Sequence, residues 1–366
     1  MRDLLNFDEQ AILSLRKLYT AYGYRPYKMS RFEEYDLYIR NKDFLISQQV
    51  ITFPGKDGRL LALKPDVTLS IIKNSPEEPG VVQKLYYNES VYRTEKNTGV
   101  FRELMQAGLE CVGDLGEYEI AEVMCLAVKS LQTLNREYIL DISHMGLVEA
   151  VLEGLERSVK AQVIGYLQQK NLHELQKFCR EENLGDEVEN KLQLLLTNAG
   201  KAEEVLINIA GCLTTDSERE AFAQMENICN VLQAQGLAEN VRVDFSVGND
   251  MRYYNGMVFQ GYLEGVPEPA LSGGQYDRLP QRMGRKSKAI GFAIYLDLLS
   301  RLQQPQDAVD ALLLYDDRSD LSALSSAVAA LAEKGSVLAS KSVPEGQSFS
   351  KTYRLVNGEA ILIENA

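Results

Sequence analysis

The sequence predicts an α+β fold with a mainly antiparallel sheet, a helical insertion and a small C-terminal α/β unit. Residues 81–93, 101–113 and 241–247 alternate in the manner of strands. Residues from about 146 to 237 are polar and helical in pattern throughout. From residue 307 onward, strand and helix patterns follow each other. We therefore expect a core over residues 1–306, with the insertion at about 146–237, and a separate unit over 307–366.

Composition indicates an ordinary globular protein that is acidic overall. The chain has 366 residues, of which 45% are hydrophobic and 25% charged, and its net charge is −13. Repulsion by this charge opposes binding to a phosphate backbone. The N-terminal residues lack the apolar centre of a signal peptide, and no apolar run has the ~18 residues that a membrane span needs. The five cysteines form no C-x-x-C pair, so we expect reduced thiols and a cytoplasmic location.

The N-terminal part predicts a helix, a hairpin and a second helix, in that order. The first helix runs from Asp8 to about Tyr22 and ends at Gly23. Its apolar face is expected to contain Ile12, Leu13, Leu15, Leu18 and Tyr19. Residues 50–68 indicate a hairpin with its turn at 54–58, and the next helix begins near Asp66.

The two long strands at 81–93 and 101–113 are followed by a helix at about 116–131 and a strand at 136–143. Within the insertion, Thr215 and Glu218 have the spacing of a capping box, and Gly236 ends that helix. Val241, Val243, Phe245 and Val247 then alternate as in one strand.

The last part of the core contains two glycine signals and one apolar segment with two possible readings. Asn255-Gly256, in "NDMRYYNGMVFQGY", is typical of a hairpin turn, although the polar residues before it are not needed for one. Gly273-Gly274 is expected to break a strand and to permit a close backbone approach. Residues 289–302 read either as a strand followed by a helix or as a buried helix.

Neither a metal site nor hydrolase chemistry is indicated by the motifs. The chain contains only two histidines, His144 and His173, and no serine lies in a nucleophile-elbow pattern. We therefore expect no metal, no cofactor and no catalytic residue of these classes.

Polar side chains gather on the strand "FRELMQAGLECVG". Arg102, Gln106 and Glu110 are separated by even numbers of residues, so they share one face of that strand. A guanidinium, an amide and a carboxylate suit a zwitterionic or phosphorylated small ligand. A solvent-facing sheet with surface ion pairs explains these residues equally well.

Five ordered segments carry a family resemblance: "KPDVT", "SVYRTEKNTGVFRELMQAGLECVG", "RYYNGMVFQGY", "SGGQYDRL" and "AIGFAIYLDLL". Together they resemble the catalytic core of class II histidyl-tRNA synthetases, from about Asp8 to Leu302. The resemblance implies a class II synthetase-like antiparallel sheet that carries a histidine-like ligand on one face. The implied pocket residues, with Arg102 on the same strand face, are Asp66, Thr68, Gln106, Glu110, Tyr254 and Tyr276.

Three positions depart from the synthetase pattern. Asn249 stands where the family has an arginine that stabilises charge during amino-acid activation, which a neutral amide cannot do. Tyr295 occupies the place of a small glycine, and Leu298 that of an arginine placed against ATP. The segment after Leu302 resembles at most the beginning of an anticodon-binding domain. With the acidic charge, this argues against tRNA binding.

A core with these losses resembles the regulatory subunits of ATP phosphoribosyltransferase, which act in the first step of histidine biosynthesis. The resemblance implies a non-catalytic chain that associates with a short-form catalytic subunit, is needed for its activity and makes it sensitive to histidine. It also implies self-association as a dimer, and no tRNA or membrane partner. A divergent histidyl-tRNA synthetase, or a paralogue that still activates an amino acid, remains the alternative.

Two questions stay open from the sequence. Histidine could bind in the ancestral pocket or at a subunit interface. The basic segment after the last pocket residue is expected to be a solvated flexible loop rather than a contact for an anionic partner or substrate. Its cationic residues are Arg282, Arg285, Lys286 and Lys288.

Overall fold

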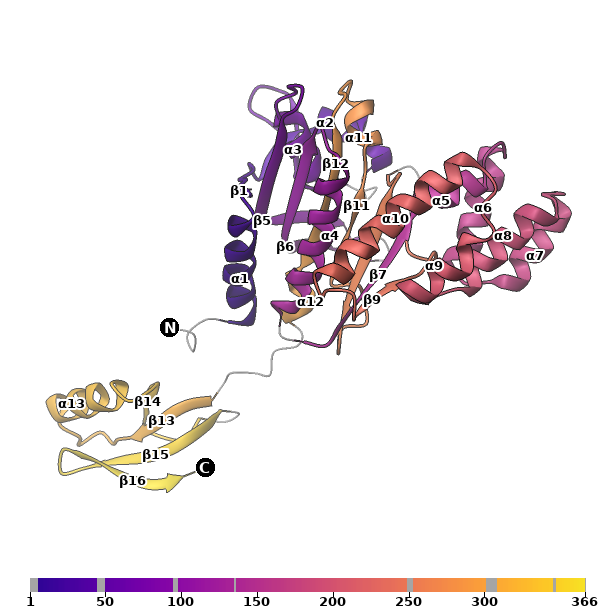
Figure 1. The fold of residues 1–366 in the computed structure, drawn as a ribbon. Helices are drawn as coiled ribbons and strands as arrows, with labels where there is room; N and C mark the ends of the chain where they lie inside the picture. The colour runs from indigo at the N-terminus through magenta and orange to yellow at the C-terminus, as the bar shows by residue number, and fades with distance from the viewer. Residues whose placement is uncertain are drawn as a thin grey trace. The chain divides into compact units, whose positions relative to one another are not determined.

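The computed structural model describes residues 6–44, 50–94, 98–134, 136–248, 253–300, 308–344 and 347–365. They belong to two compact units, Met1–Leu302 and Gln303–Ala366 (Figure 1). None of the helices within these ranges combines the length and the apolar character needed to cross a bilayer.

The described part of the first unit is built on a nine-stranded sheet. Neighbouring strands are antiparallel, except for the first pair in the order below and the pair β7–β9. This confirms the predicted α+β fold with a mainly antiparallel sheet. The spatial order is β1 (Arg25–Pro26), β5 (Val82–Thr94), β6 (Phe101–Gly113), β12 (Lys288–Tyr295), β11 (Leu271–Gln275), β10 (Met257–Leu263), β7 (Tyr138–His144), β9 (Val241–Val243) and β8 (Gly200–Lys201).

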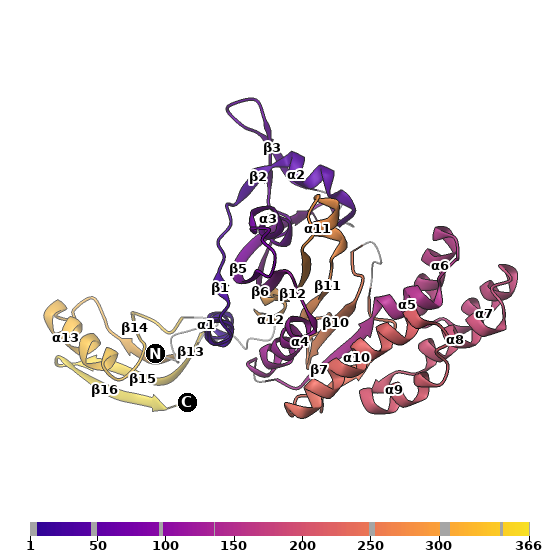
Figure 2. The ribbon, with the colours of Figure 1, turned by 45° about the horizontal axis from the view of Figure 1, so that its top comes forward.

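Each face of the sheet buries its own apolar cluster. One face, with Leu109 and Phe292, packs against α1 (Phe7–Ala21), α4 (Glu117–Gln132) and α10 (Asp216–Ala234). The other face, with Val112 and Tyr276, is covered by shorter elements (Figure 2). These elements are α2 (Tyr35–Arg40), the 3-10 helix η2 (Lys42–Phe44), α3 (Thr68–Asn74), α11 (Arg278–Arg282) and a small antiparallel sheet of β2 (Phe32–Glu34), β4 (Leu60–Leu63) and β3 (Thr52–Pro54).

The pairing of the two long strands positions the polar side chains of the site. In the antiparallel register, Tyr87 lies opposite Gly108, Leu85 opposite Glu110, and Arg93 opposite Arg102. Because side chains alternate along a strand, these residues all belong to the face covered by α3. The register therefore directs one stripe of β5 and one of β6 toward the start of α3.

The insertion is helical, as its pattern predicts. Figures 1 and 2 show its helices gathered beside β7 and β9 at one end of the sheet. Thr215 Oγ1 accepts a hydrogen bond from the Glu218 N–H, and Glu218 in turn accepts from the Thr215 N–H, so the predicted capping box begins α10. The preceding helices are α5 (Met145–Val151), α6 (Arg157–Gln168), α7 (Leu172–Glu181), α8 (Asp186–Thr197) and α9 (Ala202–Ala210).

The second unit has a four-stranded sheet in the order β14-β13-β15-β16 among its described residues. Strand β13 is parallel to β14 and β15, and helix α13 packs Ala327 and Leu331 against Leu313. The bounds are β13 (Ala308–Leu314), α13 (Leu321–Ala332), β14 (Val337–Ser340), β15 (Ser348–Val356) and β16 (Glu359–Asn365). That this unit is a truncated anticodon-binding domain stays a prediction.

Several local predictions were wrong in detail. Leu13 is 47% exposed, and Ala11 takes its place on the buried face of α1 because it stands four residues before Leu15. Strand β9 ends at Val243 because the Asp244 carboxylate accepts both the N–H and the hydroxyl of Ser246, which forms a turn.

The glycine signals also had mixed outcomes. Gly273 and Gly274 pair with Phe292 and Gly291 inside β11 and do not break it. Asn255-Gly256 does not join two paired strands, since β9 pairs with β7 and β8 rather than with β10. Of the two readings for residues 289–302, the strand followed by a helix is right, with α12 at Leu296–Ser300.

Candidate functional site

A small polar cavity lies on the α3 face of the sheet, between strands β5, β6, β11 and β12. Its volume is about 40 Å³, far below the roughly 300–1,000 Å³ of typical small-molecule sites. Six of the residues predicted for the ligand pocket line it: Asp66, Thr68, Gln106, Glu110, Tyr254 and Tyr276. Their roles toward a ligand stay predictions.

Asp66 and Thr68 are positioned by the start of α3. Asp66 Oδ1 accepts a hydrogen bond from the Leu69 N–H at 2.8 Å, so this carboxyl caps the helix. Burial raises the pKa of Asp66, although this hydrogen bond and the charge of Arg93 act in the opposite direction. Thr68 is buried and its hydroxyl donates to Glu110 Oε1 at 2.7 Å. The helix start therefore holds two polar groups at the cavity wall.

Glu110 is the most perturbed carboxyl of the site. Its side chain is buried, and burial raises its pKa to about 8 even though the hydroxyls of Tyr276 and Thr68 donate to it. A carboxyl with this pKa is mostly protonated at neutral pH. A cationic ligand group would favour the ionised form and thereby gain an anionic partner.

Tyrosine rings close the cavity. The rings of Tyr253 and Tyr254 lie 4.6 Å apart at 71°, and Tyr253 also packs against Tyr276 at 5.5 Å and Phe44 at 6.0 Å. Burial raises the pKa of Tyr254 far above its ordinary value, so it remains a neutral hydroxyl. A ligand of amino-acid size would have to displace at least one ring, because the cavity volume of about 40 Å³ is far below that of typical small-molecule sites.

Two glycines let neighbouring strands approach these groups closely. A Cβ on Gly291 would lie 1.8 Å from Glu110 Oε2, and one on Gly274 would lie 2.6 Å from Tyr254 Cδ1. The close approach expected at Gly273-Gly274 is therefore present, while the same need at Gly291 was missed.

The remaining predicted residues fall in different places. Arg102 is exposed near the start of β6, about 14 Å along the strand from Gln106, and the cavity is lined instead by Arg93. Tyr295 lines the cavity from the end of β12. Leu298 lies in α12 and packs against the core on the opposite face of the sheet. Asn249 is outside the described residues.

Tyr87 is a lining residue that sequence reasoning missed. It lies opposite Gly108, where an added Cβ would come within 2.6 Å of the Tyr87 hydroxyl oxygen. The sequence contained a signal for Tyr87, because an even number of positions separates it from Arg93 and both therefore lie on the same face of the strand. Pairing the two predicted strands in an antiparallel register would have brought this ring beside Glu110.

The basic segment expected to be a solvated flexible loop is packed instead. Arg285 donates from Nη1 to the Ser75 carbonyl at 2.6 Å and from Nη2 to the Lys73 carbonyl at 2.8 Å. The Arg282 guanidinium lies 4.8 Å from the centre of the Phe44 ring. The expectation was wrong because carbonyls at the end of a helix attract cationic donors, and α3 ends at Asn74.

The arrangement can bind a small polar molecule that carries a positive charge. The buried Glu110 carboxyl, the half-buried Asp66 carboxyl, several phenols and the Gln106 amide line the cavity, against the single guanidinium of Arg93 among its lining residues. No group of three or more histidine, cysteine, aspartate or glutamate side chains in the described ranges could hold a metal ion.

The comparisons with known proteins agree on one family. The family model for histidyl-tRNA synthetase matches residues 5–299. An ATP phosphoribosyltransferase regulatory subunit from Syntrophotalea carbinolica is 30% identical over 301 residues, which cover 80% of this chain and 70% of the relative.

Solved structures have the same fold. A crystal structure described as an ATP phosphoribosyltransferase regulatory subunit/histidyl-tRNA synthetase from Bacillus halodurans C is 25% identical, with a TM-score of 0.75, and the match covers 93% of this chain and 90% of that one. A chain from the ATP phosphoribosyl transferase (HisG:HisZ) complex of Thermotoga maritima is 20% identical, with a TM-score of 0.63 and coverage of 80% and 98%.

Proposed function

The chain belongs to the histidyl-tRNA synthetase family and, within it, to the ATP phosphoribosyltransferase regulatory subunits; from this premise we propose that it activates a short-form catalytic subunit and makes it sensitive to histidine. It is a regulatory subunit of ATP phosphoribosyltransferase and acts in histidine biosynthesis, as predicted. Its relatives are named for a regulatory role, which is the non-catalytic role expected of this chain.

The cavity on the α3 face carries the histidine part of the proposal. The ligand ammonium would contact Asp66 and Thr68, and its imidazole would contact Glu110 among the tyrosine rings. Both carboxyls have raised pKa values, with Glu110 buried and Asp66 half-buried, so a positively charged ligand relieves an existing electrostatic cost. Histidine then changes the activity of the complex if it binds one state of the assembly better than the other.

The closed form of the cavity supports a sensing role. Admission of histidine requires a ring such as Tyr253 to move, and this ring packs on Tyr254, Tyr276 and Phe44. Binding is therefore coupled to a rearrangement on the face covered by η2 and α11. A rearrangement of this kind can be transmitted to a bound partner.

Mixing this chain with a short-form catalytic subunit tests the central claim. We expect ATP and the phosphoribosyl donor to be converted to product at least about tenfold faster than by the catalytic subunit alone. This corresponds to an activation free energy that is lower by about 1.4 kcal/mol. A coupled transferase assay and a sizing column report rate and assembly together. An unchanged rate with no complex would refute the assignment of partner.

The same preparations discriminate the synthetase alternative. A chain that still activates an amino acid would catalyse histidine-dependent exchange between ATP and pyrophosphate. We expect no such exchange, because the proposed role needs binding without activation. Histidine-dependent exchange by the purified chain would favour the alternative.

A charge-removing variant, Asp66→Asn, tests the ligand pocket. Asparagine retains an oxygen for the Leu69 N–H, so α3 keeps its cap, while the ammonium loses its anionic partner. We expect histidine affinity, measured by calorimetry on the activated complex, to fall at least about tenfold. The control Asp57→Asn changes an exposed carboxylate that likewise accepts a backbone N–H, from Arg59. Equal affinity in both variants would place histidine elsewhere, such as at a subunit interface.

The remaining parts of the proposal are self-association as a dimer, absence of tRNA binding and a cytoplasmic location. All five cysteines are unpaired, and four of them are buried, which is compatible with a reducing compartment.

A further inference from the structure

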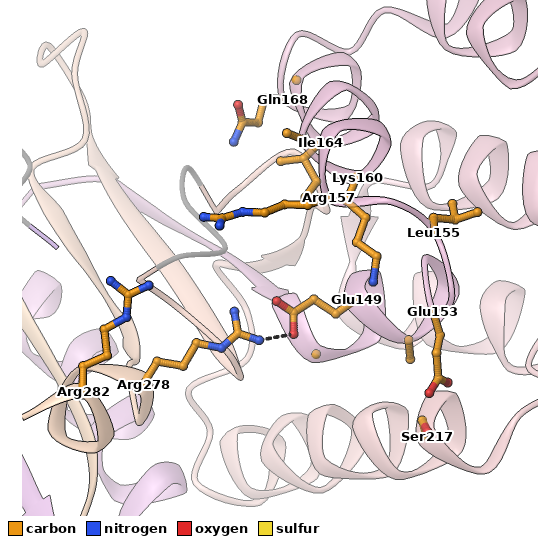
Figure 3. A pocket seen from close by; sticks show the side chains of 14 residues that line it. Glu149, Glu153, Leu155, Arg157, Lys160, Ile164, Gln168, Ser217, Arg278 and Arg282 are labelled. Carbon is orange, nitrogen blue, oxygen red and sulfur yellow. Dashed lines mark hydrogen bonds and ion pairs between the residues drawn. The ribbon is translucent and has the colours of Figure 1, made fainter. Parts of the chain in front are cut away.

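A second cleft lies where α5 and α6 of the insertion face α11 (Figure 3). Its volume is about 940 Å³, within the range of roughly 300–1,000 Å³ typical of small-molecule sites. None of the residues that line the small cavity lines this cleft. Its charged lining residues are Arg157, Lys160, Arg278, Arg282, Glu149 and Glu153.

The cations on the α11 side are held in place by contacts with other side chains. Arg278 Nη2 donates to Glu149 Oε2 at 2.6 Å across the cleft, and this ion pair is partly buried. The Arg282 guanidinium lies against the Phe44 ring. Figure 3 shows both arginines extending from α11 toward the helices of the insertion. This wall therefore presents two positioned guanidinium groups.

The opposite wall adds two cations from the first part of α6. Arg157 and Lys160 extend from this helix toward the hollow (Figure 3). Neither side chain makes a hydrogen bond or an ion pair with any other residue that the structure describes. Glu156 is the N-cap, but the first turn itself contains no acidic residue. Positive charge here opposes the helix dipole.

The lining of the cleft is therefore positively charged, although the whole chain is negatively charged. Four cations face one space against two carboxylates, in a chain whose net charge is −13. Cations brought together in this way repel each other and concentrate a positive potential in the cleft. An anion bound between the two walls would remove that repulsion.

We propose that this cleft binds a phosphate-bearing small molecule of nucleotide or sugar-phosphate size. Guanidinium groups engage phosphate oxygens in pairs, and a lysine adds a point charge. Among the described residues, the lining contains no aromatic ring, so recognition depends on phosphate rather than on base stacking. Glu149 and Glu153 can accept hydrogen bonds from sugar hydroxyls. The acidic exterior opposes a long nucleic-acid backbone. The inference is independent of the histidine pocket.

Calorimetric titration of the full-length chain tests the site with three probes: inorganic pyrophosphate, ATP and ribose 5-phosphate. The double variant Arg157→Gln/Lys160→Gln removes two cations that have no other partner among the described residues. Its matched control is Lys177→Gln/Arg180→Gln, which removes one lysine and one arginine at the same spacing from the exposed side of α7. We expect the first variant to bind the phosphates at least about tenfold more weakly, and the control to bind like wild type.

The relative affinities of the probes identify the ligand class. Tighter binding of ATP than of pyrophosphate indicates a nucleotide, and tighter binding of ribose 5-phosphate indicates a sugar phosphate. The proposal is overturned if none of the three probes binds saturably, or if both double variants lose the same affinity for the phosphates. It is also overturned if the chain binds RNA but none of the small phosphates. Asp66→Asn should leave phosphate binding unchanged, so failure of the histidine proposal is recognised separately.

Discussion

Replacement of Glu110 by glutamine, Glu110→Gln, will remove a loss of stability that the wild-type protein shows as pH rises. The pKa of this buried carboxyl is about 8 in the folded protein and near its ordinary value of 4.5 when unfolded. Between these values the folded state holds a proton that the unfolded state releases, so unfolding becomes easier with increasing pH. The slope is about 1.4 kcal/mol per pH unit for one group.

Urea unfolding of both proteins between pH 5 and 8.5 measures this difference. At pH 5 the variant is expected to resemble wild type, because a protonated carboxyl and an amide are both neutral. With rising pH the variant becomes the more stable of the two, by several kcal/mol at pH 8. Glu103→Gln, at an exposed position on the same strand, serves as control and should follow wild type. Parallel curves for Glu110→Gln and wild type would show that the Glu110 pKa is not raised.

The site was predictable to the extent that it depends on strand alternation and on ordered motifs. Gln106 and Glu110 share a face because four residues separate them, and the structure places both at one cavity. Alternation does not say how far along a face a cavity extends. Arg102 therefore has the right face but lies too far along β6, whereas Arg93 reaches the cavity from the neighbouring strand.

Long-range packing explains the other differences. The local sequence pattern predicts that the segment from Arg282 to Lys288 is a solvent-exposed loop. Nothing in this segment indicates that the end of α3 lies beside it. The carbonyls of Lys73 and Ser75 are supplied by residues about two hundred positions earlier in the chain. The cleft between α6 and α11 has the same origin, because its two walls come from the insertion and from the end of the core.

The predicted capping box illustrates how a local motif can be right and yet incomplete. Glu218 caps α10 as expected, but its carboxylate also binds Lys191 of α8, with Nζ at 2.8 Å from Oε1 and 3.0 Å from Oε2. Both side chains are buried. The motif is visible in four consecutive residues, whereas the partner lies in another helix and can be identified only once the two helices pack.

This pair leads to the second large effect, for Glu218→Ala. The substitution leaves Lys191 as a buried cation and removes the acceptor for the Thr214 and Thr215 N–H groups, at 2.7 and 3.1 Å. An uncompensated buried charge costs about 3–5 kcal/mol. We expect about 3 kcal/mol, the lower end of that range, because Lys191 keeps an ion pair with Glu187 at 2.9 Å. Urea unfolding at pH 7, followed by helical circular dichroism, measures it.

Two further variants test this explanation. Glu220→Ala alters an exposed glutamate in the same helix and should cost less than about 0.5 kcal/mol. Lys191→Met/Glu218→Gln removes both charges but keeps an acceptor for the cap, so it should be more stable than Glu218→Ala. Burial alone would raise the Glu218 pKa, but hydrogen bonds from Lys191 and from the cap lower it. The stabilisation is therefore present above pH 4.5 and is lost as pH falls further. If the double variant were as unstable as Glu218→Ala at pH 7, neither the unpaired lysine nor the lost cap would explain the loss, because this variant has no unpaired charge and keeps the cap acceptor.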